Sequence, residues 1–350
     1  MVPRNPLIRS IKSGRAIGSS SPTVLEVAKI AGVSVSTVSR ILNGTARVSE
    51  AKRQAVEDAI SALDFEPNAL AQSLKRGRSM TVGVLTQDVS SAYFTETLKG
   101  VESALTGTGY APLIASGHWN AAEESHRVRL LIARRVDGII ILSGNLTEEQ
   151  IGEYSRQVPV AATGHTVNAP RAWAVELDNE RGGYLATRHL LDLNHRQIAH
   201  VQGPEQHRDA VQRLAGYHRA LSEAGIEADP RLVVEGDFYE TSGVLAATEL
   251  LNRGTPFTAI FAANDQMAYG IRLALSRRGI RVPEDISLIG FDDLPGSTYT
   301  TPPLTTVRQP LFDVGRLAAR NLLHIIEGEA VESYTPEVEL MVRETTRRLR

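Results

Sequence analysis

The chain has 350 residues and 42% hydrophobic content, which is enough for about two domains or more. It contains no cysteine, which excludes disulfides and thiolate metal sites, and no apolar run long enough to cross a bilayer. The first 22 residues lack the apolar segment of a signal peptide, so we expect a cytoplasmic protein without membrane contact. The net charge of −2 is unevenly distributed: residues 1–79 carry 12 Lys/Arg against 6 Asp/Glu, and the remainder carries 26 against 34. A basic start on an acidic body favours a polyanionic partner at one end of the chain.

The start of the chain predicts a tail followed by two short helices. Residues 1–22 are rich in Ser, Gly, Pro and Arg without a periodic apolar pattern, which is typical of a disordered basic tail. Thr23 and Glu26 then have the spacing of a capping box that starts a helix. Gly32 permits a tight turn, and Ser34 can cap a second helix. Two short helices joined by a glycine-containing turn form a helix-turn-helix unit.

The outward positions of the second predicted helix are rich in hydroxyls. They are Val35, Ser36, Thr37, Ser39 and Arg40. In a DNA-binding unit, the first residues of this helix contact base edges, while hydroxyls and helix-end amides contact phosphates. The alternative is a helical hairpin whose Ser and Thr side chains are only solvated.

Two further helices are predicted before residue 80. Ser49 can cap a third helix whose Val56, Ile60 and Leu63 would cover the first two. The stretch "DFEPNALAQSLKRGRS" then predicts a short helix with two exposed leucines and a basic end. Such a helix is too short to be stable alone, so it needs a partner. A leucine from it could enter the minor groove of DNA, or the helix could simply pack on the body of the protein.

After Met80 the pattern changes to strands alternating with amphipathic helices. The apolar runs include "TVGVLT", "DGIIILS", "IAHVQG", "TAIFAAND" and "ISLIGFDD". Repetition of strand, helix and glycine over roughly 250 residues predicts parallel α/β layers, and so many units predict two similar lobes. Open parallel sheets bind ligands beyond the carboxyl ends of their strands. The polar residues that close three of these runs are therefore expected near a ligand site: Gln87–Asp88, Asn264–Asp265 and Asp292–Asp293.

The sequence shows no catalytic constellation. It has no Gly-rich phosphate loop, no G-x-S-x-G elbow and no H-E-x-x-H motif. His195, His200 and His207 lie close together in the sequence, but solvated or hydrogen-bonded histidines explain them better than a metal site. We therefore expect a protein that is not an enzyme and needs neither a cofactor nor a metal.

The motifs together resemble the lactose/galactose-repressor (LacI/GalR) family of bacterial transcription regulators. The resemblance runs from about residue 23 to 348. It rests on "VLEVAKIAGVSVSTVSRILNG", "RVSEAKRQAVEDAISALDFEPNALAQSLK", "VGVLTQD", "VDGIIILSG", "RLAGYHRAL", "ANDQMAYG", "ISLIGFDD" and "PPLTTVRQP".

The resemblance implies an all-α helix-turn-helix head and an α/β core of two similar parallel-sheet lobes, like a type I periplasmic binding protein. The domains would be a tail (1–22), a helix-turn-helix domain (23–67), a hinge helix and linker (68–79) and an effector-binding and dimerisation core (80–350). The N-lobe would comprise about 80–180 and 311–338, and the C-lobe about 181–310 and 339–348.

For DNA binding, the resemblance implies a recognition helix from Ser34 to Asn43 that reads bases through Val35, Ser36 and Arg40. Arg40 is the strongest candidate, because a bidentate arginine–guanine pair is the commonest specific contact. The hinge helix would span about Asn68 to Lys75, with Leu74 as the minor-groove wedge. The full set of expected DNA contacts is Thr23, Ser34, Val35, Ser36, Thr37, Ser39, Arg40, Asn43, Asn68, Ala71, Leu74 and Lys75. A homodimer would bind a near-palindromic double-stranded operator.

For the effector, the family pattern implies contacts from Arg213, Asn264, Asp292 and Gln309. Tyr93 or Phe94, together with Phe238, could supply a flat surface on which a sugar ring or base stacks. Thr163 and His165 follow a strand where the family often has an acidic residue, so the ligand contact there is open. For Asp265 and Asp293 we expect structural hydrogen bonds instead.

The sequence thus predicts a ligand-responsive, sequence-specific DNA-binding regulator, expected to repress carbohydrate-utilisation genes. One alternative within the family is a purine or another non-sugar effector that acts as a co-repressor. An alternative from another class is a solute-binding protein, which would need a signal peptide and no basic head. An enzyme built on the same lobes is disfavoured by the missing catalytic group.

Overall fold

The computed structural model describes residues 22–42, 48–65, 77–333 and 336–350. The chain forms two compact units, which meet in the sequence between Ser79 and Met80. Several sequence predictions lie outside the described residues: the tail up to residue 21, the hinge helix, and the expected contacts Asn43, Asn68, Ala71, Leu74 and Lys75.

The first unit contains three helices around a small apolar core. They are α1 (Val24–Ala31), α2 (Val35–Leu42) and α3 (Glu50–Leu63). The predicted capping box of Thr23 and Glu26 is present, and Gly32 ends α1 in the left-handed conformation with φ of 65°. Val27, Val38 and Val56, one from each helix, are completely buried. The helix-turn-helix prediction is therefore confirmed.

One local prediction about this unit was wrong. Ser49 does occupy the N-cap position of α3, but its side chain makes no capping hydrogen bond. By contrast, the Ser34 hydroxyl accepts the Thr37 amide of α2 at 3.2 Å, as expected for an N-cap.

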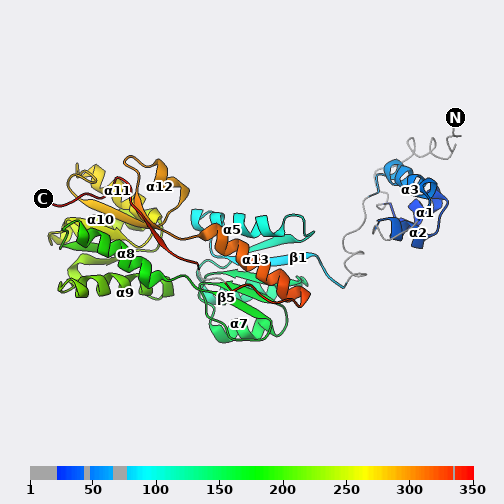
Figure 1. The fold of residues 1–350 in the computed structure, drawn as a ribbon, viewed down its shortest axis with the longest axis horizontal. Helices are drawn as coiled ribbons and strands as arrows, with labels where there is room; N and C mark the ends of the chain where they lie inside the picture. The colour runs from blue at the N-terminus through cyan, green and yellow to red at the C-terminus, as the bar shows by residue number, and fades with distance from the viewer. Residues whose placement is uncertain (1–21, 43–47, 66–76, 334–335) are drawn as a thin grey trace. The chain divides into compact units, whose positions relative to one another are not determined.

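The first lobe of the core, which contains β1 and β5 in Figure 1, is built on a parallel sheet. The strand order of this sheet is β2-β1-β3-β4-β5. Its strands are β1 (Thr81–Thr86), β2 (Ala111–Ser116), β3 (Gly138–Leu142), β4 (Val160–Thr163) and β5 (Ala172–Val175). Helices α5 (Ala92–Leu105) and α13 (Leu311–Glu327) cover one face, and α6 (Ala121–Ala133) and α7 (Glu148–Ser155) cover the other. Every residue of β3 is buried, as the continuous apolar run predicted for a sheet covered on both faces.

The second lobe has a sheet of order β11-β10-β9-β8-β6-β7. Its strands are β6 (Ile198–Gln202), β7 (Val233–Glu235), β8 (Ala259–Ala262), β9 (Ser287–Asp292), β10 (Thr305–Arg308) and β11 (Glu339–Met341). One face carries α8 (Asn179–Asp192) and α9 (Arg208–Glu223), and the other carries α10 (Glu240–Arg253) and α11 (Asp265–Arg277). Two short helical segments, η2 (Pro230–Leu232) and α12 (Pro295–Tyr299), complete the lobe.

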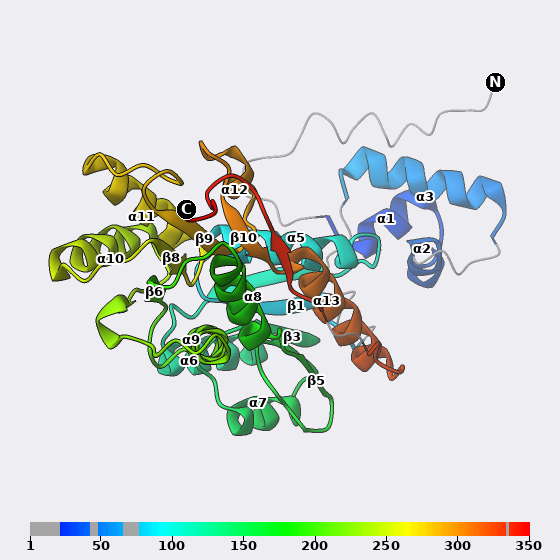
Figure 2. The same ribbon diagram turned by 60° about the vertical axis from the view of Figure 1, so that its left-hand side comes forward.

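Neither lobe is continuous in the sequence. The chain enters the second lobe after β5, returns to the first lobe as α13 beside α5, and ends in the second lobe as β11 (Figures 1 and 2). The predicted architecture of two similar parallel-sheet lobes is confirmed. The exception is β11, which pairs with β10 in the antiparallel direction.

Three pairs of helices cross at reciprocal glycines. In each pair, a Cβ atom added to either glycine would overlap a backbone carbonyl of the partner helix. The pairs are Gly100 of α5 with Gly315 of α13, Gly183 of α8 with Gly216 of α9, and Gly243 of α10 with Gly270 of α11. Only a residue without a side chain permits backbones to approach this closely, so these glycines determine the spacing of the helices.

Replacement of one crossing glycine should test this packing. Gly315→Ala places a methyl group against the Thr97 carbonyl, so we expect it to destabilise the core by about 3 kcal/mol or more. Gly152→Ala in α7 is the matched control, because its Cβ would meet only the Ala169 side chain at 3.6 Å. Helix propensity predicts a neutral or stabilising effect there. Urea unfolding of both variants measures the difference; equal stability would contradict the role of the crossing.

Candidate functional sites

The first candidate site is the outward surface of α2 in the first unit. Val35, Ser36 and Arg40 are exposed, whereas Thr37 and Ser39 are half-buried. The Ser34 hydroxyl lies 2.9 Å from that of Ser36 and 2.8 Å from that of Thr37. A helix N-terminus surrounded by hydroxyls suits contact with phosphate oxygens, and Arg40, about one and a half turns further along α2, suits contact with a base edge.

Thr23, at the start of α1, is also exposed. Its backbone amide and its hydroxyl both donate to the Glu26 carboxylate, at 2.7 and 3.1 Å. The capping box therefore fixes the orientation of the first helix turn. The Thr23 hydroxyl is therefore already hydrogen-bonded within the capping box.

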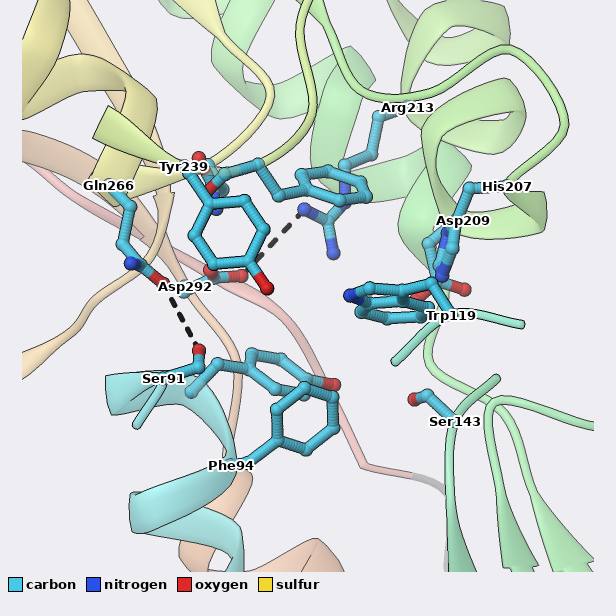
Figure 3. Close-up of a pocket in the computed structure, with 13 residues that line it drawn as sticks. Ser91, Phe94, Trp119, Ser143, His207, Asp209, Arg213, Tyr239, Gln266 and Asp292 are labelled. Carbon is cyan, nitrogen blue, oxygen red and sulfur yellow. Dashed lines mark hydrogen bonds and ion pairs between the residues drawn. The ribbon is translucent and has the colours of Figure 1, made fainter. Parts of the chain in front are cut away.

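The second candidate site is a cleft between the two lobes of the core (Figure 3). Its residues follow the carboxyl ends of strands in both sheets, where parallel sheets bind ligands. The first lobe supplies Ser91, Tyr93, Phe94, Trp119 and Ser143. The second lobe supplies His207, Asp209, Arg213, Phe238, Tyr239, Asn264, Gln266 and Asp292.

Arg213 is the polar centre of the cleft. Its Nε donates to Asn179 at 2.8 Å and its Nη1 donates to the Ala263 carbonyl at 2.6 Å. The guanidinium lies 3.9 Å from the centre of the Phe291 ring, and its Nη1 lies 3.7 Å from Asp292 Oδ1. Two of the five N–H donors of an arginine are used in these hydrogen bonds, so donors remain for a ligand.

Asp292 faces Arg213 from the end of β9. Gln309 Nε2 donates to its Oδ1 at 2.6 Å. Burial raises the pKa of Asp292 to about 7, although Arg213 and the Gln309 hydrogen bond act in the opposite direction. The carboxylate thus has acceptor positions left for ligand hydroxyls and titrates near neutral pH.

Aromatic rings form the walls of the cleft. Trp119 lies edge-on to His207, with the ring centres 4.6 Å apart, and Phe94 lies edge-on to Tyr93 at 5.0 Å. The ring centre of Phe238, on the second lobe, lies 6.4 Å from that of Trp119, on the first lobe. Such flat apolar surfaces suit the faces of a sugar ring or a base.

The backbone is strained at the cleft. Among the described residues, eleven that are not glycine have a positive φ, and four of the eleven line the cleft. They are Trp119 (56°), Ser143 (54°), Phe238 (71°) and Asp292 (110°). Residues in such conformations cost about 1–3 kcal/mol each and persist where the surroundings fix them, often at ligand sites. The strain therefore supports a functional role for this cleft.

Two effector predictions lie behind the cleft and do not line it. The Thr163 hydroxyl accepts the Ser143 amide at 3.2 Å, and Gln309 supports Asp292. Asn264 does line the cleft, but its Oδ1 accepts the Met267 amide at 2.9 Å and its Nδ2 donates to the Phe238 carbonyl at 2.8 Å. All three hold residues that line the cleft, namely Ser143, Asp292 and Phe238.

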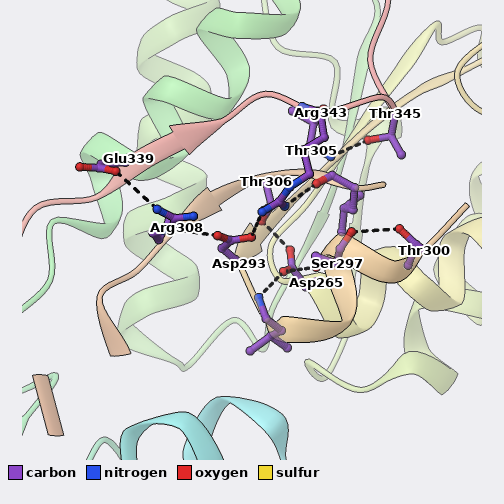
Figure 4. Close-up of polar contacts among 12 residues, drawn as sticks. Asp265, Asp293, Ser297, Thr300, Thr305, Thr306, Arg308, Glu339, Arg343 and Thr345 are labelled. Carbon is purple, nitrogen blue, oxygen red and sulfur yellow. Dashed lines mark hydrogen bonds and ion pairs between the residues drawn. The ribbon is translucent and has the colours of Figure 1, made fainter. Parts of the chain in front are cut away.

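Asp265 and Asp293 lie in a separate polar network (Figure 4). Asp265 is completely buried and accepts the Thr306 hydroxyl at 2.6 Å and the Leu294 amide at 2.8 Å. Asp293 accepts Arg343 at 2.6 Å and Arg308 at 2.8 Å. Both aspartates tie β9 and β10 to neighbouring segments, which agrees with their predicted structural role.

Sequence reasoning missed seven residues that line the cleft: Ser91, Trp119, Ser143, His207, Asp209, Tyr239 and Gln266. A usable signal existed for two of them, because Ser143 ends the predicted run "DGIIILS" and Gln266 directly follows "TAIFAAND". Behind Trp119 and Ser143 lies the completely buried Glu124, whose carboxylate accepts the amides of Asn145 and Leu146 at 2.9 and 3.1 Å. Gln87 joins the same support by donating to the Ser143 carbonyl at 3.1 Å and accepting the Trp119 amide at 2.8 Å.

The described residues contain no candidate metal-binding cluster and no candidate membrane span. No group of three or more His, Asp or Glu side chains in these residues is arranged to hold a metal ion. Within the same residues, no helix combines the length and the apolar character needed to cross a membrane.

Comparison with protein families identifies both units. Residues 23–68 match the family described as bacterial regulatory proteins, lacI family, and residues 187–346 match a periplasmic binding protein-like domain. The HTH-type transcriptional repressor PurR of Vibrio atlanticus (strain LGP32) is 36% identical over 93% of this chain and 99% of its own length.

Solved structures agree with these matches. The lac repressor dimer bound to operator and the anti-inducer ONPF has a TM-score of 0.85 and 32% identity, covering 94% of this chain and all of that one. The complex of the transcriptional regulator CelR with cellobiose has a TM-score of 0.68 and 36% identity, covering 93% of this chain and 99% of that one. These relatives are regulators rather than enzymes, with a DNA-binding head and a small-molecule core. The chain therefore belongs to the lacI family of bacterial transcription regulators, which bind operator DNA as dimers and respond to a small-molecule effector.

Proposed function

We propose that the protein represses carbohydrate-utilisation genes from a near-palindromic operator in the cytoplasm, and that its effector is a neutral sugar. The observation that carries the proposal is the charge of the cleft. Arg213 is the one Lys or Arg among its lining residues, which also include two aspartates, Asp209 and Asp292. A phosphorylated or carboxylated ligand would meet excess negative charge there, whereas sugar hydroxyls can donate to carboxylates and accept from a guanidinium.

The comparisons support this choice of ligand class. CelR, with 36% identity, was solved with cellobiose. The aromatic walls of the cleft also suit a sugar ring, whose apolar face stacks on them.

A purine acting as a co-repressor is the alternative. The observations that favour it are the aromatic walls, which suit a flat base, and the 36% identity to a repressor named PurR. The charge of the cleft does not distinguish a neutral base from a neutral sugar.

For DNA recognition, we propose that Val35, Ser36 and Arg40 contact bases, and that Thr23, Ser34, Thr37 and Ser39 contact phosphates. Five further residues are also proposed to contact the DNA: Asn43, Asn68, Ala71, Leu74 and Lys75. The proposed domain limits are those given by the sequence: head 23–67, hinge and linker 68–79, and core from 80.

For the response, we propose that the effector stabilises closure of the two lobes over the cleft. Two hydrogen bonds already join the lobes at its edge: Tyr239 Oη donates to Asp88 Oδ2 at 3.1 Å, and Ser91 Oγ donates to Gln266 Oε1 at 3.1 Å. An effector changes operator affinity only through its different affinity for the open and closed states.

Tyr239→Phe should weaken this closure. The variant keeps the ring in the cleft but loses the hydrogen bond to Asp88, so we expect effector affinity to fall about fivefold, as for the loss of roughly 1 kcal/mol. Tyr299→Phe is the matched control, because Tyr299 is 84% exposed. Isothermal titration calorimetry measures both. Unchanged effector affinity in Tyr239→Phe would show that the hydrogen bond between Tyr239 and Asp88 does not stabilise the closed state.

A thermal-shift screen with sugars, sugar phosphates and nucleobases tests the proposed function. We expect a neutral sugar to raise the melting temperature of the full-length protein, because ligand binding stabilises the native state. The same sugar should change the affinity for operator DNA in an anisotropy titration. A shift with nucleobases alone would favour the purine alternative, and a sugar that stabilises the protein without changing operator affinity would contradict its role as effector.

A further inference from the structure

Trp119 contacts rings of the second lobe from the first-lobe side of the cleft. Its indole lies edge-on to His207, with the ring centres 4.6 Å apart, and its ring centre lies 6.4 Å from that of Phe238. Ser143 lines the cleft on the same lobe as Trp119 (Figure 3). We call Trp119 and Ser143 together the first-lobe wall. Both residues lie in loops that follow strands, so their positions depend on what holds these loops.

Side chains hold the backbone of the first-lobe wall. The Trp119 amide donates to Gln87 Oε1 at 2.8 Å, and the Trp119 carbonyl accepts Asn145 Nδ2 at 2.6 Å. Gln87 Nε2 in turn donates to the Ser143 carbonyl at 3.1 Å. Trp119 and Ser143 have φ of 56° and 54°, conformations that persist only where the surroundings fix them. These three hydrogen bonds therefore join the two loops of the wall to each other.

Glu124 of α6 holds the loop from which Asn145 reaches Trp119. Its carboxylate accepts the Asn145 amide at 2.9 Å and the Leu146 amide at 3.1 Å. The side chain is completely buried, and this burial raises the pKa of Glu124 to about 7. The two amides act in the opposite direction, because they stabilise the ionised form. The loop that the carboxylate holds therefore also compensates for the burial of its charge.

Two glycines make room for these buried side chains. A Cβ atom added to Gly117 would overlap Glu124 Cγ, and one added to Gly144 would lie 2.7 Å from Glu124 Oε2. Gly144 also has a φ of 129°, which residues with a side chain rarely adopt. The backbone at both positions therefore fits closely around the Glu124 side chain.

We propose that Glu124 is the positioning residue of the first-lobe wall. Its carboxylate fixes the loop of Asn145, and the Asn145 side chain fixes the Trp119 carbonyl. Gln87 links Trp119 to Ser143, so the wall moves with α6 as one piece when the lobes close, and an effector meets it already ordered. Without Glu124, binding would have to order the wall, which lowers affinity. Glu124 does not line the cleft and acts only through these neighbours.

The fluorescence of Trp119 tests this role without any ligand. The chain has two tryptophans, so Trp173→Phe makes Trp119 the only one and provides the reference protein. In this background, Glu124→Leu removes both acceptor oxygens. We expect Trp119 emission to shift to longer wavelength and acrylamide to quench it more strongly, because the indole loses its fixed contacts with the second-lobe rings. Glu124→Gln keeps the size of the side chain and one acceptor oxygen, so its effect should be intermediate.

Leu105→Ala in the same background is the control for a general loss of stability. Leu105 is 3% exposed, is the last residue of α5 and makes no part of the first-lobe wall. Its truncation should lower the stability measured by urea unfolding but leave the emission of the folded protein unchanged. Unchanged emission and quenching in Glu124→Leu, or the same change in Leu105→Ala, would overturn the positioning role.

Asn145→Ala keeps the proposal testable if Glu124→Leu does not fold. Asn145 is exposed, and the variant keeps its backbone amide for Glu124 but loses the hydrogen bond to the Trp119 carbonyl. We expect the same shift of Trp119 emission to longer wavelength. Asn168→Ala is the matched control, because Asn168 is also exposed on the first lobe and lies outside the wall. Emission that stays at the reference wavelength in Asn145→Ala would contradict the proposed link from Glu124 to Trp119.

Calorimetric titration with four neutral sugars measures the effect on binding. The probes are D-glucose, D-galactose, cellobiose and lactose, and this measurement rests on the proposed sugar effector. For each sugar that binds the reference protein, we expect Glu124→Leu to weaken binding about tenfold, as for the loss of one hydrogen bond to a charged group. A changed Trp119 emission with unchanged sugar affinity would overturn the role of Glu124 in binding. If none of the four sugars binds the reference protein, the proposed function fails, whereas the fluorescence of Trp119 still decides the positioning role.

Discussion

Asp292→Asn is expected to weaken effector binding about 100-fold while leaving operator binding unchanged. The carboxylate faces Arg213 inside the cleft and is 3% exposed. Hydrogen bonds to charged groups contribute roughly 1.5–3 kcal/mol each, so the loss of a charged acceptor for two hydroxyls accounts for this factor. Asparagine keeps the size of the side chain and its acceptor for Gln309, so the strand end should remain in place.

Asp293→Asn is the matched control for this prediction. Its carboxylate is bound by Arg308 and Arg343 and does not line the cleft. The variant should lose stability but keep its effector affinity. Calorimetric titration of both variants with the effector measures the two affinities. If Asp292→Asn bound the effector as tightly as the wild type, Asp292 would not contact the effector.

The same residue predicts how binding depends on pH. Burial raises the pKa of Asp292 to about 7. Ligand hydroxyls donate to the ionised form, so binding is strongest above this pKa and weakens as the pH falls from 8 to 6. In Asp292→Asn this dependence should disappear.

Arg40→Ala is expected to lower operator affinity about 10- to 100-fold, with non-specific binding reduced only about twofold. A bidentate contact to a base contributes roughly 1–3 kcal/mol of discrimination, whereas a phosphate contact affects all sequences alike. Anisotropy titrations with an operator selected from random duplexes and with a scrambled duplex measure the two effects.

Lys52→Ala is the control for the loss of one positive charge. Lys52 is exposed and lies on α3, not on α2. We expect it to weaken binding to both duplexes equally. If Arg40→Ala behaved in the same way, Arg40 would be a phosphate contact and would not read a base.

Local signals in the sequence were enough for much of the fold. The capping box at Thr23 and the turn at Gly32 depend only on residues close in the sequence, so the sequence predicts them. The continuous apolar strands are predictable because their composition indicates burial on both faces of a sheet. The antiparallel β11 could not be predicted in this way, because its pairing with β10 depends on residues over thirty positions away.

Only part of the candidate site was predictable from the sequence. Arg213, Asn264 and Asp292 belong to family motifs, and they line the cleft. Trp119 and His207 were missed because their positions depend on loop conformation: Trp119 has a φ of 56°, and no periodicity encodes that. Thr163 and Gln309 were expected to line the cleft but lie behind its lining. The sequence does not show whether a side chain near a strand end points into the cleft or towards a neighbouring segment.

The reciprocal glycines have a mechanical consequence. At each of these crossings the two backbones touch directly, so no side chain lies between the helices there that could rearrange. A displacement of one helix of a pair is therefore passed on to the other helix. The two hydrogen bonds across the cleft start at Ser91 and Tyr239, the N-caps of α5 and α10, so a displacement at the cleft edge also reaches the helices that cross these two, α13 and α11.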